Sequence, residues 1–428
     1  MISITLKPRH RGIKIVATLI TVAMSSGSWC ARYSLESDLG VSLRHNDNIR
    51  FSPTKKESLH GYTTNPRFKA EVEDGNWGAS LDVDMTFGRF NREEYNSDDQ
   101  VILLEANKNT ERHYLSVTGR RVRDSTRTSE ADTSGIVTAS AERREYNSIS
   151  PSWTFLATGH NTLTVNSTYS QTEYYTDDFV DSRYKKVGIS WNRKFDSDTR
   201  VTIRLTGAAN SPDERQIKYL GFFDIGTTVE STSYGLQVGG NYLVTENLIL
   251  SGLVGSTRSE QKYKLRDPQG ACRILVDALK PGQCRLEDYD VTNFVADLSA
   301  TWKHERGATN ISYSMQNNPS SQGYEVRYER YRLGWNYKLN EKSDFKLGFN
   351  YGTNKVLNDA IASVDSDSIN RDYRGVSVGY HYRITDNWKI NSNYSYKWQN
   401  KDNVKALAES NSIILGINYQ PTMSSWSR

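Results

Sequence analysis

The sequence predicts an all-β fold: a transmembrane, antiparallel, up-and-down β-barrel of 18 strands. The first observation is that apolar and polar residues alternate at period two over residues 33–419, with no long apolar segment among them. In the clearest run, Trp77 and Leu81 point one way while Asp82 and Asp84 point the other. The second observation is that short turns and longer loops alternate along the chain, and the third is that aromatic residues gather at the strand ends.

Residues 1–31 have the composition of a secretory signal peptide. Lys7, Arg9, Arg11 and Lys14 precede or enter the apolar stretch 13–24, and small residues follow it. That stretch is short for a transmembrane helix, although an N-terminal membrane anchor is the alternative. We expect cleavage between Ser28 and Ala31, a barrel over residues 32–419, and a short C-terminal tail over residues 420–428.

Composition narrows the class of protein. The leader holds four of the 54 basic residues and none of the 50 acidic ones, so the remaining chain is formally neutral. Its charge therefore gives no argument for a nucleic-acid partner. The 26 Tyr and nine Trp suit β-strands. A mean hydropathy of −0.68 excludes a helical membrane bundle but fits a barrel, in which every second strand residue meets lipid.

The alternation places the 18 strands in order along the chain. They are expected at 33–45, 58–73, 77–89, 100–107, 112–122, 144–156, 161–173, 184–194, 199–210, 231–243, 248–258, 290–302, 308–317, 324–339, 343–353, 373–384, 388–399 and 410–419.

The connections between these strands alternate in length. The short ones carry the Gly, Asn and Asp of tight reversals, and they lie at 74–76, 157–160, 195–198, 245–247, 304–307, 340–342 and 385–387. The others are mostly longer and polar, the longest falling between Ser259 and Asp288. Short turns at one end and long loops at the other are typical of bacterial outer-membrane barrels, with the turns in the periplasm. An even strand count would leave both termini periplasmic.

Aromatic residues form two groups along the strands, as in the interfacial girdles of a membrane barrel. Next to the short turns or the chain end are Trp77, Trp153, Phe155, Trp191, Tyr242, Trp302, Tyr337, Phe345, Tyr382, Trp388 and Tyr419. Nearer the longer loops are Phe87, Tyr169, Tyr234, Phe294, Tyr313, Tyr351 and Tyr394.

Some strands are weaker predictions than others. Pro66 and Pro151 each remove a ladder donor from a predicted strand, and the facing of residues 100–107 is ambiguous. A barrel of 16 strands with an altered start is the alternative. The final run ends at Tyr419 and looks like the closing-strand signal of outer-membrane proteins, but nine further residues follow it.

If the apolar positions face lipid, their neighbours line an aqueous lumen that tilts basic. The basic lumen residues are Arg67, Lys69, Arg120, Arg200, Arg204, Arg330, Arg332, Lys338, Lys346, Lys389 and Lys397, and the acidic ones are Glu36, Asp38, Glu71, Asp82, Asp84, Asp297 and Asp344. One interpretation is that these charges pair across strands and hold the wall. The other is that the basic residues contact an anionic, elongated solute.

Cys272 and Cys284 fall in one predicted loop, and a cysteine pair in an exported protein indicates a disulfide. The spacing would also suit a metal pair, but no His or third Cys lies near, so we expect no metal and no cofactor. Catalysis finds little support, because we expect no Ser/His or Asp/His pair to share one wall at one height. His45 lies beside Asp47, where exposed turn residues are the simpler account.

Two segments resemble the family called putative β-barrel porin 2 and related outer-membrane barrels associated with exopolysaccharide secretion. They are GVSLRHNDNIRFSP (residues 40–53) and YNSISPSWTFLATGHNTLTVNSTYSQTEYYTDD (residues 146–178). The resemblance implies a single-domain outer-membrane conduit for a polysaccharide chain, linked to the inner membrane through a separate periplasmic export protein. A diffusion porin for small solutes or oligosaccharides is the alternative, and a structural or adhesive surface barrel is a third interpretation.

Overall fold

The computed structural model describes residues 31–125, 142–176, 179–213, 215–219, 223–266, 288–319, 325–357, 370–401 and 404–427. These residues form one antiparallel sheet, of which 18 strands close into a barrel, so the predicted fold class is confirmed. The predicted leader lies outside the described residues except for Ala31. Within the described ranges, no helix has the length and apolar composition that a membrane crossing requires.

The strands follow the predicted order with small differences at their ends. They are β1 (Arg32–Asn46), β2 (Leu59–Asp74), β3 (Trp77–Phe90), β4 (Ser97–Asn109), β5 (His113–Ser125), β6 (Arg143–Leu156), β7 (Asn161–Tyr174), β8 (Ser182–Lys194), β9 (Thr199–Pro212), β10 (Arg215–Tyr219), β11 (Phe223–Thr245), β12 (Leu248–Arg266), β13 (Tyr289–His304), β14 (Gly307–Pro319), β15 (Glu325–Lys338), β16 (Ser343–Val356), β17 (Arg371–Arg383), β18 (Trp388–Lys401), β19 (Val404–Tyr419) and β20 (Ser424–Ser427). One short 3-10 helix, η1 (Glu93–Tyr95), precedes β4.

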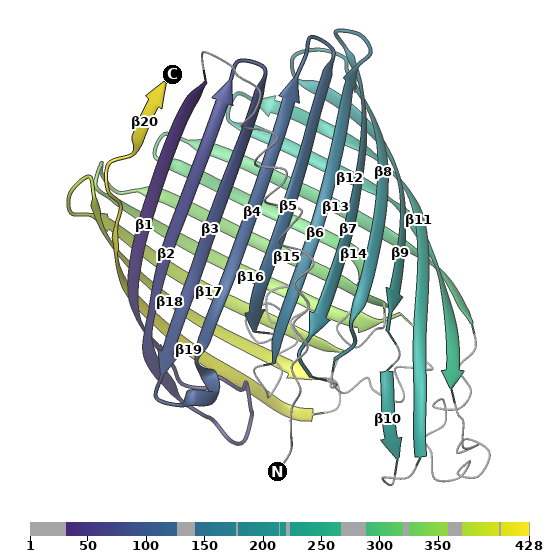
Figure 1. Cartoon of the computed structure of the whole chain (residues 1–428), viewed down its shortest axis with the longest axis vertical. Helices are drawn as coiled ribbons and strands as arrows, with labels where there is room; N and C mark the ends of the chain where they lie inside the picture. The colour runs from purple at the N-terminus through teal and green to yellow at the C-terminus, as the bar shows by residue number, and fades with distance from the viewer. Residues whose placement is uncertain are drawn as a thin grey trace.

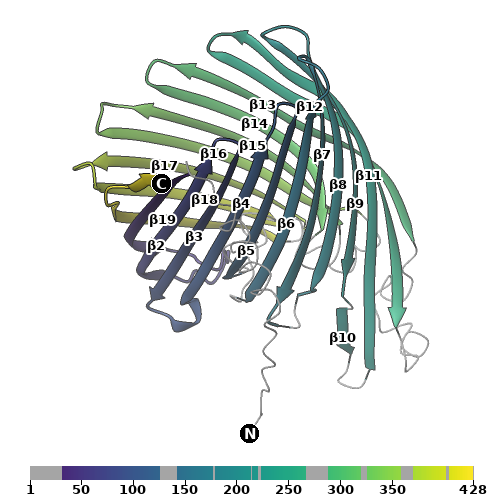
Figure 2. The ribbon, with the colours of Figure 1, turned by 45° about the horizontal axis from the view of Figure 1, so that its top comes forward.

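Each barrel strand pairs with its neighbours in sequence, and β19 returns to pair with β1 from Leu39↔Tyr419 to Asn46↔Ser412. In Figure 1 the strands β1 to β9 slope across the front of the wall, while β14 to β18 cross behind them at a different slope. Figure 2 shows the wall curving round so that β19, in yellow, returns to the side of the purple first strand, with which it pairs. This slope is the strand tilt that closure of a sheet requires.

The short connections all lie at one end of the barrel, called here the turn end, which runs from the left side to the top of Figure 1. Asp196 shows how such a turn is held: the backbone N–H groups of Asp198 and Thr199 donate to its Oδ1 at 2.8 and 2.6 Å. These hydrogen bonds lower the pKa of the Asp196 carboxyl. The opposite end, called the loop end, carries η1 and the small strand β10.

Strands β11 and β12 are longer than predicted, and they project beyond their neighbours at the loop end together with β10. Beyond the predicted limits the alternation continues with charged residues in place of apolar ones. Lys264 Nζ lies 2.6 Å from Glu230 Oε1 across this extension. Charged cross-strand pairs suit a hairpin that stands in water rather than in lipid.

Both prolines lie within strands without ending them. Pro66 is paired opposite Leu39 of β1, but the ladder to β3 skips residues 65 and 66. Pro151 is paired opposite Val117 of β5, and the ladder to β7 skips residues 150 and 151. Side chains bridge both gaps, because Asn65 donates to Thr86 and Ser150 bonds Thr168 at 3.0 Å. Each proline therefore costs ladder bonds on only one side.

The C-terminal tail extends the closing seam. Strand β19 ends opposite Leu39, which leaves the first part of β1 without a partner on that edge. After Tyr419 the chain pairs again as β20, from Arg32↔Ser427 to Leu35↔Ser424. Trp426 stacks on Tyr33 with the ring centroids 5.8 Å apart. The residues beyond the terminal aromatic thus cover an edge that would otherwise present unpaired backbone groups.

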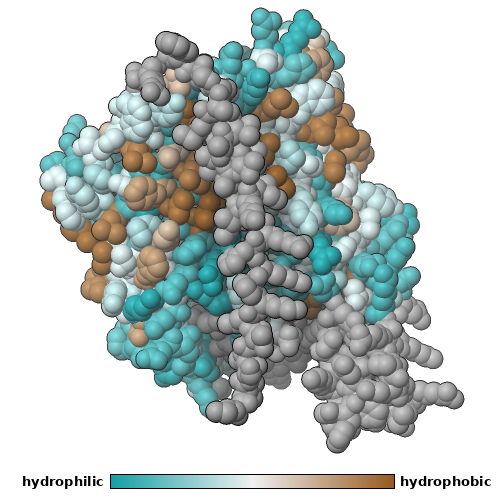
Figure 3. All heavy atoms as spheres, in the orientation of Figure 1, coloured by the Kyte–Doolittle hydropathy of each residue, from teal (hydrophilic) through white to brown (hydrophobic). Residues whose placement is uncertain are grey.

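The outer face is apolar, and its large side chains are exposed. Leu43 is 64% exposed, Phe68 55% and Leu205 53%, values that a water-facing sheet would rarely carry in such number. Figure 3 shows hydrophobic residues at mid-height, with hydrophilic ones toward both ends. Aromatic rings pack together at the turn end, as in Trp388 with Tyr419, and farther along the strands toward the loop end, as in Tyr313 with Tyr331. This arrangement is that of a barrel spanning a lipid bilayer.

A cluster of side-chain bonds holds the loop end of the seam, and we call it the seam clasp. It joins Asn46, Asp47 and Asn48 to residues 409–411 of β19. Asn48 is fully buried, and its Nδ2 donates to the carbonyl oxygens of Glu409 at 2.7 Å and Ser52 at 2.9 Å. The expectation that the segment around Asp47 consists of exposed turn residues is therefore wrong for Asp47 and Asn48, because both side chains bond the last strand.

Leu81→Arg should impair assembly of the barrel. Leu81 lies on the outer face of β3 between Ala70 and Leu104, and an arginine at the bilayer midplane of a barrel costs about 2–4 kcal/mol. The measurement is the fraction that folds into liposomes, read from heat-modifiable mobility on a gel. The matched control is Ser80→Arg, which places the charge inside the barrel between Glu71 and Glu105. Equal folding yields for the two variants would contradict the facing of β3.

Asn48→Ala should lower the stability of the seam. It removes both donor bonds from Nδ2 and the 3.1 Å bond that Oδ1 accepts from the Ser52 N–H. Leaving buried partners unsatisfied costs about 1–3 kcal/mol. The readout is a lower temperature for loss of the folded band, with Lys55→Ala, an exposed change in the same loop, as the control. An unchanged transition temperature would show that the clasp contributes nothing to closure.

Candidate functional site

The inner face of the barrel carries the residues that alternate with the exposed apolar row. The strand register places all nine candidate contact residues on this face. They are Arg67, Lys69, Arg120, Arg200, Arg204, Arg330, Arg332, Lys346 and Lys389. The inner face also carries hydroxyl pairs between neighbouring strands, such as Ser42 with Thr63 at 2.7 Å.

Two of the nine are engaged in ion pairs within the wall. Arg67 forms a bidentate pair with Asp82, with Nε 3.0 Å from Oδ1. Lys69 pairs with Glu71, and Asp84 and Asp38 lie near Arg67 as further acids. These contacts match the interpretation that lumen charges hold the wall, and they concentrate on β2 and β3. Neither cation is free to bind a passing solute strongly.

The other seven have different surroundings. Lys389 Nζ donates to Gln420 Oε1 at 3.0 Å, and the Arg330 guanidinium lies 5.5 Å from the Tyr328 ring centroid. The remaining five are Arg120, Arg200, Arg204, Arg332 and Lys346. Over the described ranges, none of these five has a carboxylate within 4.0 Å. The strands spread them around the barrel, so the nine do not form one site.

At the loop end, part of the wall folds into the lumen. The ladder between β13 and β14 stops at Ala296↔Met315, whereas β14 and β15 stay paired as far as Pro319↔Glu325. Beyond that break, Glu325 accepts hydrogen bonds from Ser259 and Gln261 on the inner face of β12. The paired ends of β14 and β15 thus leave the wall together, and the end of β15 lies against the inner faces of β12 and β13.

Apolar side chains complete this contact, which we call the inner cluster. Val326, Tyr328 and Val356 pack together with Tyr263 of β12, and Glu325 is only 6% exposed. Arg327 donates to Asn293 of β13, and Tyr184 of β8 lies within electrostatic reach of Glu325. Strands β12, β13 and β15 therefore meet inside the lumen, and the inner cluster occupies this side of the loop end.

On the other side, a cavity of about 800 Å³ remains open. Its lining comes from residues of β1 to β6 and β15 to β19, from the β1–β2 loop and from residues at and next to η1. Among the nine candidate residues the cavity brings together Arg330 and Arg332, and it adds Arg44, Arg143 and Lys397. Its neutral lining includes six serines and four asparagines among apolar and aromatic residues, so a hydrated solute would find hydrogen-bond partners there.

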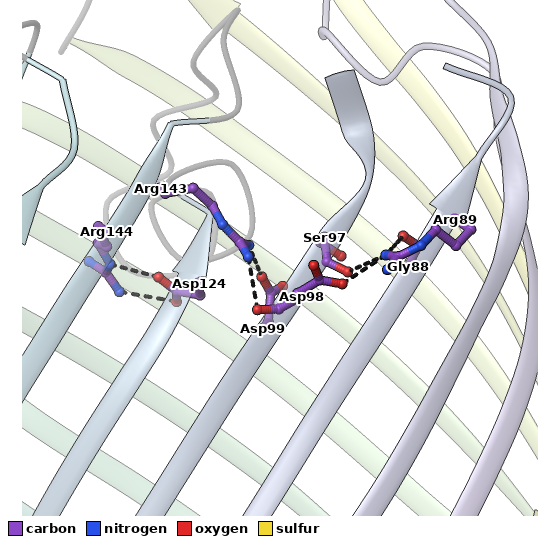
Figure 4. A network of polar contacts seen from close by, with 8 residues as sticks. All are labelled: Gly88, Arg89, Ser97, Asp98, Asp99, Asp124, Arg143 and Arg144. Carbon is purple, nitrogen blue, oxygen red and sulfur yellow. Dashed lines mark hydrogen bonds and ion pairs between the residues drawn. The ribbon is translucent and has the colours of Figure 1, made fainter. Parts of the chain in front are cut away.

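Ion pairs fix the rim of this cavity on β3 to β6, as Figure 4 shows. Arg143 donates to Asp99 at 2.7 Å and to the Asp98 carbonyl oxygen at 2.8 Å. Arg89 bonds Asp98 at 2.8 Å, and Arg144 bonds Asp124 at 3.0 Å. These residues sit on successive strands, so the pairs link four neighbouring strand ends into one rigid edge.

A second rim contact lies between the β1–β2 loop and η1. Arg50 Nε donates to the Tyr95 hydroxyl at 2.9 Å and pairs with Glu57, also at 2.9 Å. Glu57 accepts Arg92 as well, and Tyr95 is 2% exposed. The β1–β2 loop is thereby held against η1 at the edge of the cavity.

One expectation about catalysis is wrong. Asp344 and His381 are direct cross-strand partners on β16 and β17, with His381 Nδ1 2.9 Å from Asp344 Oδ2. The two residues are 37 positions apart, so only the register between β16 and β17 shows that they are paired. Among the described residues, no group of three His, Cys, Asp or Glu is placed to hold a metal ion.

Several residues of the site were missed at the level of sequence. Arg44 follows Val41 and Leu43 in alternation, so its inward direction could have been found from the pattern alone. Glu325 and Arg143 could not, because both depend on where strand ends bend. Cys272 and Cys284, the predicted disulfide, lie outside the described residues.

Comparison with known proteins adds distant structural likenesses. No family model and no curated protein matches the chain, so the resemblance to putative β-barrel porin 2 is not confirmed. The fold is similar to Acinetobacter baumannii OccAB3 (11% identity, TM-score 0.45, 92% of this chain and 99% of that one). It is also similar to a BenF-like porin from Pseudomonas fluorescens Pf-5 (9%, 0.46, 91% and 99%) and to the copper transporter OprC (10%, 0.49, 92% and 69%).

Sequence identities near 10% and TM-scores below 0.5 give no information about what this barrel transports. That has to be inferred from its own residues. A closed 18-stranded barrel with an apolar exterior, interfacial aromatics and a polar interior is an outer-membrane β-barrel channel.

Glu325→Ala should widen the lumen at the loop end. Without the carboxylate, Ser259 and Gln261 lose their partner, and the end of β15 loses about 1–3 kcal/mol of hydrogen bonding to β12. The expected result is a larger and noisier single-channel conductance in planar bilayers. Glu329→Ala is the matched control, because Glu329 lies on the same strand but accepts Tyr313 and Tyr331 on the outer face. Unchanged conductance in Glu325→Ala would show that the inner cluster does not limit flow.

Proposed function

We propose that this outer-membrane barrel is a passive diffusion channel for small hydrophilic solutes. The observation that carries the proposal is the open cavity of about 800 Å³, enclosed by a continuous wall and lined by polar residues from eleven of its strands. A volume of this size accommodates one small molecule with its hydration rather than a bulky ligand.

The lumen wall supports passage rather than tight binding. Much of its hydrogen-bonding capacity is already used between strands, as in Ser150 with Thr168 and Thr154 with Thr164, both at 3.0 Å. Paired hydroxyls can still accept a hydrogen bond from a passing solute. Each such bond replaces a hydrogen bond to water, so its net contribution to the binding free energy is small. A pore that passes solutes without holding them needs weak contacts of this kind.

For orientation, we place the turn end and both termini in the periplasm. The short turns gather at one end, and the projecting hairpin of β10, β11 and β12 carries charged pairs at the other. Outer-membrane barrels put their short turns on the periplasmic side and their longer loops outside. The loop-end cavity would then be the first compartment that an entering solute meets.

Export of an exopolysaccharide is the second candidate. What favours it is the neutral stripe on β6 and β7, where Ser148, Ser150, Ser152, Asn166 and Ser170 follow one another on the inner face. A hydrated polymer could slide along such hydroxyl and amide groups through many weak contacts. In that case Arg67, Lys69 and the other spread-out cations would contact the chain, and a periplasmic export protein would deliver it.

Reconstitution and deletion test the proposal together. Liposomes containing the purified barrel should swell rapidly in a pentose or hexose and slowly in a tetrasaccharide, because the cavity admits one small solute at a time. Empty liposomes are the control. The deletion strain should grow more slowly when a small hydrophilic solute is limiting, with surface polysaccharide unchanged. Loss of surface polysaccharide with normal uptake would instead promote the export candidate and overturn the diffusion channel.

A further inference from the structure

The loop-end cavity is lined by more basic residues than acidic ones. Five basic residues of the inner wall and rim line it, namely Arg44, Arg143, Arg330, Arg332 and Lys397. Arg374 of β17 also borders the cavity, but its guanidinium lies over the Tyr351 ring on the outer face. Among the described lining residues, Asp99 is the one carboxylate, and it is already bonded by Arg143 at 2.7 Å. The cavity therefore holds positive charge that its own wall does not neutralise.

Three of these cations face the cavity with neutral neighbours. Arg332 lies between Ser312 and Asn350, Lys397 lies between Gly375 and Ser410, and Arg44 lies between Gly61 and Ile414. In the part of the chain that the structure describes, none of the three has a carboxylate within 4.0 Å.

Arg44 provides an independent observation, a buried hydrogen-bond donor that is unsatisfied within the described part of the chain. Its Nε is buried and has no hydrogen-bond partner among the described atoms. A buried donor without a partner costs free energy, and a ligand acceptor would remove that cost. Guanidinium groups bind carboxylates and phosphates through two parallel hydrogen bonds, whereas the lysine ammonium acts as a point charge.

We propose that this cavity is a binding subsite for small hydrophilic oxyanions, solutes that carry two or more carboxylate or phosphate groups. The inference rests on the diffusion channel proposed above and names the solute class that the channel favours. Arg44, Arg332 and Lys397 contact the oxyanion, and Ser377, Asn393 and Ser412 bond its hydroxyl groups. The subsite concentrates anions at the loop end, from which they pass down the polar wall.

The subsite binds weakly and in a salt-dependent way. Its cations are spread over β1, β15 and β18 in a water-filled compartment, where each charge pair is screened over about 8–10 Å at physiological ionic strength. Transient occupancy is what a channel requires, because a solute held tightly would block flow.

Single-channel recording of the full barrel in planar bilayers tests the subsite, with citrate and inorganic phosphate as probes and glucose as the neutral comparison. Citrate should interrupt the potassium chloride current briefly, phosphate should do so more weakly, and glucose should not. In the double variant R332Q/K397Q the citrate concentration for half-block should rise about tenfold or more, since charge-assisted hydrogen bonds are lost.

The matched control is K186Q/K194Q, which removes two inner-face cations of β8 that do not line the cavity. It should leave citrate block within about twofold of the wild type, because neither lysine lines the cavity and charges in water are screened. Folded-band mobility on a gel shows that all variants assemble.

The outcomes separate the subsite from the channel. Equal weakening in the two double variants, or block by glucose as strong as by citrate, would overturn the subsite. Potassium chloride conductance without any citrate block would overturn it too, while leaving the diffusion channel standing. A barrel that conducts no ions at all would overturn both.

Discussion

The backbone N–H and C=O groups of a chain in lipid cannot form hydrogen bonds to water, and the rest of the structure depends on this constraint. Every N–H and C=O in the spanning region must find a partner in a neighbouring strand, so the sheet has to close on itself. Closure depends on the seam between β1 and β19, which has only eight paired residues on each side. The seam clasp at one end and β20 at the other extend the joined edge well beyond those pairs.

Closure also divides the side chains into two environments at every step. The outer row meets lipid and is apolar, and the inner row meets water and can carry charge without desolvation. The charged residues of the inner row occur in two arrangements, paired with an opposite charge or surrounded by neutral residues. On β2 and β3 acids and bases alternate closely enough to pair, as Arg67 does with Asp82. On β15 and β18 the neighbours of the cations are serines, asparagines and glycines, so Arg332 and Lys397 keep their charge available.

The lumen owes its shape to one break in an otherwise regular ladder. Where β13 and β14 part beyond Ala296, the end of β15 turns inward and buries Glu325 against β12. The inner cluster occupies one side of the lumen, which leaves the cavity against β1 to β6 and β15 to β19. Strand β15 therefore contributes to both features. Its residues 325–328 belong to the contact around the inner cluster, and Arg330 and Arg332 line the cavity.

The sequence by itself determined the barrel, its strand count and the inward direction of the predicted cations. Alternation at period two is a local property, and a slip of one residue would move every apolar side chain from lipid to water. Pro66 and Pro151 do not interrupt the alternation, because each loses its backbone pairing to only one of its two neighbouring strands.

Tertiary structure alone decided which inner residues meet. The seam clasp joins Asn48 to Glu409, the inner cluster joins Ser259 to Glu325, and Asp344 reaches His381 across a hairpin. These contacts join residues from 37 to 361 positions apart, and they depend on register, on closure and on where strand ends bend. No spacing in the sequence carries that information, because the cavity exists only once opposite walls of the barrel face each other.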